Sequence, residues 1–346
     1  MKRRADIDWV RTVSALGVIL IHSSSQFVGR SSRYALLSVT PAMLCNQAFR
    51  FCVPVFFMLS GLGLGLSGQS FRLLPFWFRR FRRIGVPYVL WSAFYFLQSN
   101  HFLVSRVLTG PALQTFCRLL LTGGAASHLW FLPVLLQFYL LYPALKPGME
   151  RRPGLTLALS FLLSMYCTLA VRSLLPFPSW WKARLWRLFP VWLFYFTLGM
   201  AMTGERLERI ALLARKYAIP ICLFVLIAAF AYAADARRSG DLESVKPQLF
   251  LYSPLCFLGI AASWKWFARI PGMSAASGFL ARHSMTLYFS HVFFLNLLRR
   301  RTFFSASFFT MLLMDVVVTA LSALTALLPE EAKRWAKRRA LPPGPG

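Results

Sequence analysis

Three residues of the first apolar segment carry side chains that could do acid–base chemistry. Asp8, Arg11 and His22 lie in the stretch IDWVRTVSALGVILIHSSS, whose other residues are mostly apolar. At 100° per residue, the steps from Arg11 to His22 make about three helical turns, so both side chains share one face, roughly 16 Å apart along the axis. Asp8 lies one turn before Arg11 and can pair with it. Ionisable groups at membrane depth are costly, so this stripe is a candidate site.

His22 is the candidate general base of this stripe, because an imidazole can take a proton from a hydroxyl group near neutral pH. A structural hydrogen bond to a neighbouring helix is the alternative role. His291, in the later segment HSMTLYFSHVFFLNLL, is the second candidate, with the same alternative. Asp315 is a lone acid in the last apolar segment. Pairing with an arginine and a place in a polar cavity both remain open for it.

The second apolar segment, NQAFRFCVPVFFMLSGLGLGL, combines a cation with small residues. Arg50 lies near its outer end, where a long side chain can reach the membrane interface. Ser60 is followed by Gly61 and two further glycines, so backbones or a ligand can approach this end closely. Close helix packing and a ligand site are equally compatible with that pattern.

A dense basic cluster follows in FRLLPFWFRRFRRIGVPYVLW. Guanidinium groups bind phosphates through paired hydrogen bonds, so four neighbouring arginines could surround a polyphosphate; they are Arg79, Arg80, Arg82 and Arg83. Membrane topology and anionic lipid headgroups would also explain such a cluster. With the N-terminus in the cytoplasm, Arg11 is expected at the same membrane face. An anionic cofactor arriving from the cytoplasm would then meet all of these groups.

The composition indicates that lipid is the solvent for much of the chain. Of the 346 residues, 57% are hydrophobic and 14% are charged, and the mean hydropathy is +0.56. A soluble domain of this length needs more polar surface to cover its core. The formal net charge is +28, but the basic residues alternate with apolar segments of spanning length, which a nucleic-acid-binding protein does not need. We therefore expect a membrane protein with no nucleic-acid partner.

The fold predicted from these segments is all-α: a polytopic transmembrane helix bundle with about ten spanning helices. The expected spans are 7–27, 42–66, 86–104, 128–146, 154–175, 187–203, 218–235, 249–267, 284–298 and 303–328. One transmembrane domain would cover residues 1–334, and residues 335–346 would form a basic, disordered cytoplasmic tail. Lys and Arg are more frequent in the loops that this arrangement places inside, which favours cytoplasmic termini. No cleavable signal peptide is predicted.

Metal and nucleotide motifs are not predicted anywhere in the chain. The six cysteines are scattered without a CxxC pair and are interpreted as small buried apolar residues. No P-loop, dinucleotide fingerprint or HExxH sequence is present. The chemistry must therefore come from the polar residues described above.

Several motifs, in order along nearly the whole chain, resemble acyltransferase family three, whose multi-pass membrane enzymes include glycan O-acetyltransferases. They are Arg11 and His22 with ten residues between them, VPVFFMLSG, RFRRIGVPYVLW, HLWFLPVLLQFYLLYPAL and SMTLYFSHVFF. The resemblance implies that His22 is the catalytic base and that Arg11 belongs to its site. Arg80 and Arg83 match the basic pair that meets the phosphates of acyl-CoA. Ser60 matches the serine of an SGF-like motif, although Leu62 replaces its usual aromatic residue.

The resemblance also implies the reaction. An acyl group, expected to be acetyl, would pass from cytoplasmic acyl-CoA to a hydroxyl of a glycan, a lipid-linked sugar or a similar acceptor in the bacterial inner membrane. Acyl-CoA would be a substrate, with no permanently bound cofactor. The alternative is a transporter or flippase for a lipid or glycan that uses Asp8, Arg11 and Asp315 as a pathway. A non-catalytic membrane sensor or assembly subunit is a third hypothesis, which leaves the stripe of Arg11 and His22 unexplained.

Overall fold

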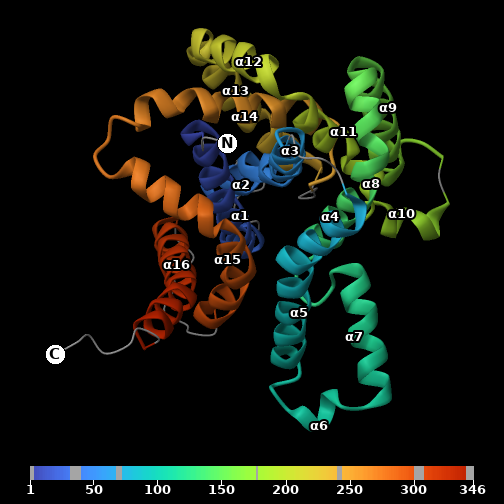
Figure 1. Ribbon diagram of the computed structural model, residues 1–346, viewed down its shortest axis with the longest axis vertical. Helices are drawn as coiled ribbons and strands as arrows, with labels where there is room; N and C mark the ends of the chain where they lie inside the picture. Colours follow the sequence, from blue (N-terminus) through green and yellow to red (C-terminus); the bar gives the residue numbers. More distant parts are fainter. Residues whose placement is uncertain are drawn as a thin grey trace. The chain divides into compact units, whose positions relative to one another are not determined.

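The structure is a computed structural model that describes residues 4–31, 40–67, 72–176, 178–239, 244–299 and 308–339. Every regular element in these ranges is helical, which confirms the all-α fold class (Figure 1). The last helix, α16, extends from Phe308 to Arg339, so the first residues assigned to the basic tail are helical. The rest of that predicted tail lies outside the described residues.

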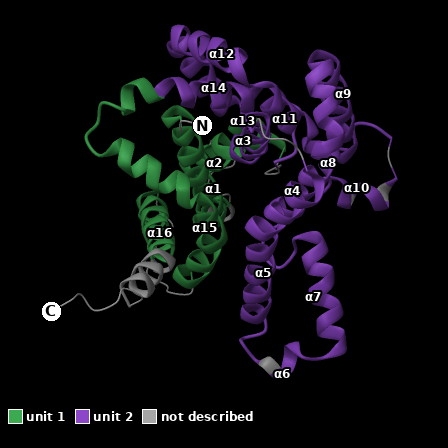
Figure 2. Ribbon diagram, viewed as in Figure 1, with its two compact units in different colours: residues 1–50, 233–240, 264–346 green, residues 51–232, 241–263 purple. Residues whose placement is uncertain are grey.

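The helices form two compact units, each made of segments that are distant in sequence (Figure 2). Unit 1 contains residues 1–50, 233–240 and 264–346, and unit 2 contains residues 51–232 and 241–263. Two helices, α13 (Ala218–Ser239) and α14 (Leu249–Phe267), begin in unit 2 and end in unit 1.

Unit 1 is built around α1, which contacts each of the other main helices of that unit. These helices are α1 (Ala5–Ser31), α2 (Pro41–Ala48), α15 (Met273–Arg299) and α16. The Thr12 hydroxyl donates to the Ser277 carbonyl of α15 at 2.9 Å, and the Ser23 hydroxyl donates to the Asp315 carboxylate of α16 at 3.2 Å. The predicted stripe of ionisable residues therefore lies on the central helix of its unit.

Unit 2 is larger and packs around α11. Its elements are α3 (Cys52–Gly65), α4 (Leu73–Arg80), η2 (Phe81–Gly85), α5 (Val86–Ser99), α6 (Val104–Val107), α7 (Gly110–Thr122), α8 (Phe131–Arg151), α9 (Pro153–Val171), α10 (Ser179–Leu185), α11 (Phe189–Ala201), α12 (Gly204–Lys216) and the first parts of α13 and α14; a short η1 (Phe49–Phe51) precedes α3. Helix α11 packs against α3, α8 and α9. The rings of Phe138 and Phe196 stack 4.5 Å apart in this core.

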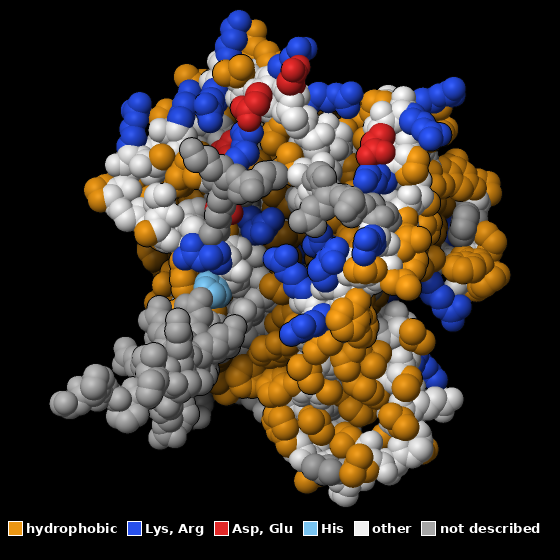
Figure 3. All heavy atoms as spheres, viewed as in Figure 1, with side chains coloured by type: hydrophobic (Ala, Val, Ile, Leu, Met, Phe, Trp, Pro, Cys, Tyr) orange, Lys and Arg blue, Asp and Glu red, His pale blue; other side chains and the backbone are white. Residues whose placement is uncertain are grey.

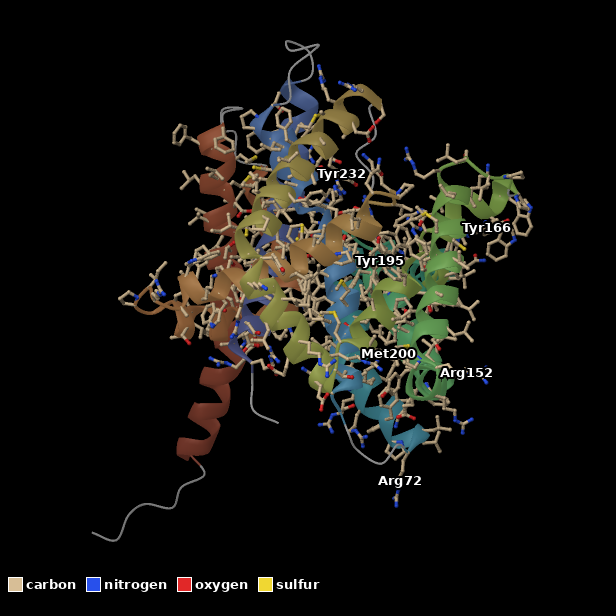
Figure 4. The ribbon with its side chains drawn as sticks, turned by 90° about the horizontal axis from the view of Figure 1, so that it is seen from above. Arg72, Arg152, Tyr166, Tyr195, Met200 and Tyr232 are labelled. Carbon is tan, nitrogen blue, oxygen red and sulfur yellow. The ribbon has the colours of Figure 1, made fainter. Side chains whose placement is uncertain are left out.

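Two glycines set the closeness of α3 and α11. A Cβ atom on Gly61 would lie 2.0 Å from the Phe196 carbonyl oxygen, and one on Gly199 would lie 2.0 Å from the Met58 carbonyl oxygen. Neither position has room for a methyl group, so the two backbones meet as small residues allow in membrane helices. Figure 4 shows Tyr195 and Met200 of α11 among packed side chains, whereas the exposed Arg72 lies at the edge of the unit.

Helices α5 and α7 lie side by side (Figure 1). The Tyr88 hydroxyl of α5 donates to the Leu120 carbonyl of α7. No described residue of α7 is buried, and its side chains include Leu121, which is 82% exposed. Apolar side chains cover this part of the surface in Figure 3. Such a surface is what lipid contact requires, because the hydrocarbon core is as apolar as leucine.

Four helical runs in the described residues are long and apolar enough to cross a membrane: Pro41–Gly65, Pro153–Val171, Ala218–Ser239 and Phe308–Leu327. Each of the ten predicted spans overlaps a helix or helical run, but the number of spanning helices is not confirmed as ten. Helix α11 is apolar but has only 13 residues. Helices α1 and α15, which carry His22 and His291, are not among these four runs.

Candidate functional site

His22 of α1 faces His291 of α15 inside unit 1. The two ring centroids are 5.2 Å apart and the ring planes are tilted by 51°. His291 is fully buried, and its Nδ1 lies 3.1 Å from the Leu287 carbonyl oxygen. Because a carbonyl oxygen only accepts, Nδ1 of His291 carries the proton in this bond, which fixes the ring. Half-buried His22 thus stands against a rigid second imidazole, the residue that the sequence ranked second.

A buried amide network connects this helix turn to α2. Asn46 is fully buried, and its Nδ2 donates to the Ile21 carbonyl at 3.0 Å and to the Ser25 hydroxyl at 2.9 Å. Its Oδ1 accepts from Gln47 Nε2 at 2.8 Å and from Arg50 Nη2 at 2.7 Å. Asn46 therefore uses both ends of its amide to hold Arg50 beside the turn of α1 that carries His22.

Arg50 has a different position from the one expected for an interfacial side chain. It bonds inward to Asn46, which in turn donates to the Ile21 carbonyl directly before His22. Asp315 also belongs to this region, since it accepts the hydrogen bond from Ser23, the neighbour of His22 in sequence. A polar cluster of two imidazoles, a guanidinium, an amide and a carboxylate thus gathers within otherwise apolar helices.

The other predicted residues of α1 lie nearer its N-terminus. Asp8 and Arg11 are both half-buried on the same helix as His22, as the periodicity predicts. Their mutual ion pair stays a prediction. At the first turn, Asp6 accepts two hydrogen bonds from Arg4, at 2.8 and 3.2 Å. Acidic residues in the first turn also stabilise a helix through its dipole.

Ser60 of α3 lies in unit 2, and its hydroxyl donates to the Phe56 carbonyl one turn earlier at 2.8 Å. The neighbouring Gly61 packs against α11, as described above. Helix packing therefore accounts for Gly61, whereas a Cβ atom on Gly63 would meet nothing within 4 Å. A catalytic role for Ser60 stays a prediction.

The arginine cluster of unit 2 lies where α4 gives way to the π-helical turn η2 and then to α5. Arg80 is half-buried, with its guanidinium carbon 5.4 Å from the Phe76 ring centroid and 5.3 Å from that of Tyr139. The other three are exposed: Arg79, Arg82 and Arg83. π-Helical turns often occur at functional sites. Aromatic packing fixes one cation of this cluster and leaves three available to a ligand in solution.

The pattern of the whole chain identifies its family. Residues 4–329 match the family profile of acyltransferase family three, which is described as an acyltransferase domain. The chain belongs to acyltransferase family three. No curated protein and no solved structure matches it at a significant level. The family match supports an acyltransferase function, and together with the apolar helices it indicates a membrane protein.

Within this family three domain, sequence reasoning missed Asn46 and Gln47. Both are fully buried, and their side chains form the network that holds Arg50. Two neighbouring amides inside the predicted span 42–66 were the available signal, since unpaired amides at membrane depth are costly. The pairing of His22 with His291 was not predicted, because no local spacing relates α1 to α15.

Proposed function

We propose that this chain is a membrane-embedded acyltransferase that moves an acyl group, expected to be acetyl, from cytoplasmic acyl-CoA to a hydroxyl group of a glycan, a lipid-linked sugar or a similar acceptor. The observation that carries the proposal is the pair formed by His22 and His291 within the polar cluster of unit 1, in a chain of acyltransferase family three. The proposed location is the bacterial inner membrane, with both termini in the cytoplasm.

His22 acts as the general base in this proposal. It takes the proton of the acceptor hydroxyl while the hydroxyl oxygen attacks the carbonyl carbon of the thioester. The tetrahedral intermediate then expels the CoA thiolate, which receives the proton from His22. The new ester bond and free CoA are the products. Asp8 and Arg11 are proposed to complete the site on the same face of α1.

Donor binding is assigned to the arginine cluster. Exposed guanidinium groups at Arg79, Arg82 and Arg83 suit the phosphates of acyl-CoA, and the neighbouring Arg80 contacts the rings of Phe76 and Tyr139. Because guanidinium groups bind phosphate through paired hydrogen bonds, their removal weakens donor affinity and leaves the chemical step intact.

The decisive experiment is transfer of label from radioactive acetyl-CoA by the purified full chain in nanodiscs, with mixed cell-envelope glycans as acceptors. We expect His22→Ala to lose transfer by a factor of about 10²–10⁴, the range for a general base. His283→Ala is the matched control, because His283 is a half-buried histidine of α15 that packs on Phe279. Near-normal transfer by His22→Ala would contradict the assignment of the base.

The same experiment tests the alternative function. A wild-type protein that neither transfers label nor binds acetyl-CoA saturably would favour another donor or a transporter. A transporter would instead move a lipid or glycan across the membrane in proteoliposomes without acyl-CoA, and that transport would not depend on thioester cleavage.

A further inference from the structure

Arg50 is held by a chain of hydrogen bonds that begins on the backbone of α1. Asn46 Nδ2 donates to the Ile21 carbonyl, the residue directly before His22, and Asn46 Oδ1 accepts from Arg50 Nη2 at 2.7 Å. A hydrogen bond from a guanidinium is charge-assisted and stronger than one between neutral groups. The position of the Arg50 side chain is therefore coupled to the helix turn that carries the base.

Asn46, which holds Arg50, has a fixed orientation of its own. Asn46 is fully buried, and Gln47 Nε2 donates to the same Oδ1 at 2.8 Å. Two donors fill the two lone pairs of this oxygen, so the amide has one settled orientation. An arginine that only extends to the membrane interface needs a flexible side chain and contact with water. The hydrogen bonds to Asn46 instead hold Arg50 in one position.

Arg50 places a positive charge in the polar cluster that carries the candidate base. Its guanidinium bonds to Asn46, which also holds the backbone carbonyl directly before His22, and the ring of His22 stands against His291. A cation beside a base that must become an imidazolium opposes the reaction, unless the cation faces an anion that forms in the same step. Attack on a thioester forms such an anion, the oxygen of the tetrahedral intermediate, on the same carbon to which the oxygen activated by His22 bonds.

We infer that Arg50 is a catalytic residue that binds the carbonyl oxygen of the acyl thioester and the oxyanion that replaces it, and that Asn46 is its positioning residue. This inference rests on the proposed acyl transfer. His22 accepts the hydroxyl proton, the acceptor oxygen bonds to the carbonyl carbon, and the electron pair of the C=O bond moves to the oxygen held by Arg50. Collapse restores the double bond and releases the CoA thiolate, which takes the proton.

The test compares steady-state kinetics of wild type, Arg50→Ala and Asn46→Ala as full chains in nanodiscs, with radioactive acetyl-CoA as the donor. Loss of one oxyanion donor lowers kcat by about 10²–10³. We expect this loss for Arg50→Ala, with donor and acceptor KM changed less than about threefold, and a smaller loss in kcat for Asn46→Ala. Added guanidinium chloride at millimolar concentration should restore part of the Arg50→Ala activity but none of the His22→Ala activity.

Arg282→Ala is the matched control, because Arg282 is an exposed arginine of the same unit. It should keep wild-type kcat. If Arg50→Ala proves unstable in thermal unfolding, Arg50→Gln replaces it, since glutamine keeps hydrogen bonding to Asn46 without the charge. Guanidinium rescue would not be expected from a purely structural role of Arg50.

Two results would overturn the inference while the proposed function stands. The first is a wild-type kcat in the Arg50 variants. The second is an increase in acceptor KM alone, which would mean that Arg50 binds an anionic group of the acceptor. In both cases wild type transfers label and His22→Ala does not. A wild-type protein with neither transfer nor acetyl-CoA binding overturns the proposed function, and this inference with it.

Discussion

The rings of His22 and His291 lie 5.2 Å apart, although one residue is on the first helix of the chain and the other is on α15. The bond between His291 Nδ1 and the Leu287 carbonyl oxygen fixes the second ring, so His22 packs against a rigid partner. In this chain of acyltransferase family three, the pair gives the candidate base a defined orientation. Its consequences can be tested one side chain at a time.

The first prediction concerns His291 as a positioning residue. His291→Ala should lower kcat by at least about tenfold, because small displacements of a catalytic group are costly to the rate. The donor KM should change little, since the arginines proposed to bind the donor lie on other elements. Steady-state kinetics with labelled acetyl-CoA provide the measurement, and His283→Ala provides the control. Equal loss of activity in both variants would indicate a general effect on α15 instead.

A second prediction separates donor binding from chemistry. Arg83 is exposed, so Arg83→Ala should leave the fold intact and raise the KM for acetyl-CoA by at least about tenfold, since a hydrogen bond to a charged group contributes about 1.5 kcal/mol or more. Arg209→Ala is the control, because Arg209 is exposed on α12 and pairs with Glu205. A donor KM unchanged in Arg83→Ala would assign the cluster to membrane topology. Higher ionic strength should weaken wild-type donor binding as well.

The third prediction tests the packing of α3 against α11. Gly61→Ala would bring a methyl group to 2.0 Å from the Phe196 carbonyl, which backbone atoms cannot easily relieve. We expect a loss of stability of at least about 2 kcal/mol, as for overpacked cores. Gly63→Ala on the same helix meets nothing within 4 Å and should be nearly neutral. Thermal unfolding in detergent compares the two, and equal melting temperatures would show that the helices separate readily.

A variant of Asp315 distinguishes an acyltransferase from a transporter. Asp315→Asn keeps an oxygen that can accept the Ser23 hydrogen bond, so acyl transfer should stay within about threefold of wild type. A transport pathway through Asp315 needs its charge and would be lost in this variant. The measurement is label transfer beside flux in proteoliposomes. Loss of acyl transfer in Asp315→Asn would show that the carboxylate takes part in the chemistry.

The helical fold and the face of α1 were predictable from the sequence because both depend on local order. Apolar segments of spanning length must be helical in lipid, since every backbone polar group needs an internal partner. The period of 3.6 residues then places Arg11 and His22 on one side of α1. The family motifs are likewise read along the chain, and the profile over residues 4–329 confirms that resemblance.

The number of spanning helices was less predictable. Helix α5 ends at Ser99, before the end of the predicted span 86–104, and α7 returns along it. The π-helical turn joining α4 to α5 also has no simple sequence signal. Hydropathy locates apolar residues, but helix ends depend on hydrogen bonds in the last turn and on the contacts of each neighbour.

By itself, the sequence determined an all-α membrane protein of acyltransferase family three and the helix that carries its candidate base. Only the tertiary structure decided that His291, Asn46 and Arg50 gather around that base. The physical reason is the range of the interactions. Helix periodicity acts within a few residues, whereas a buried amide or guanidinium finds its partner wherever the packing of distant helices places one, because burial leaves no water to replace it.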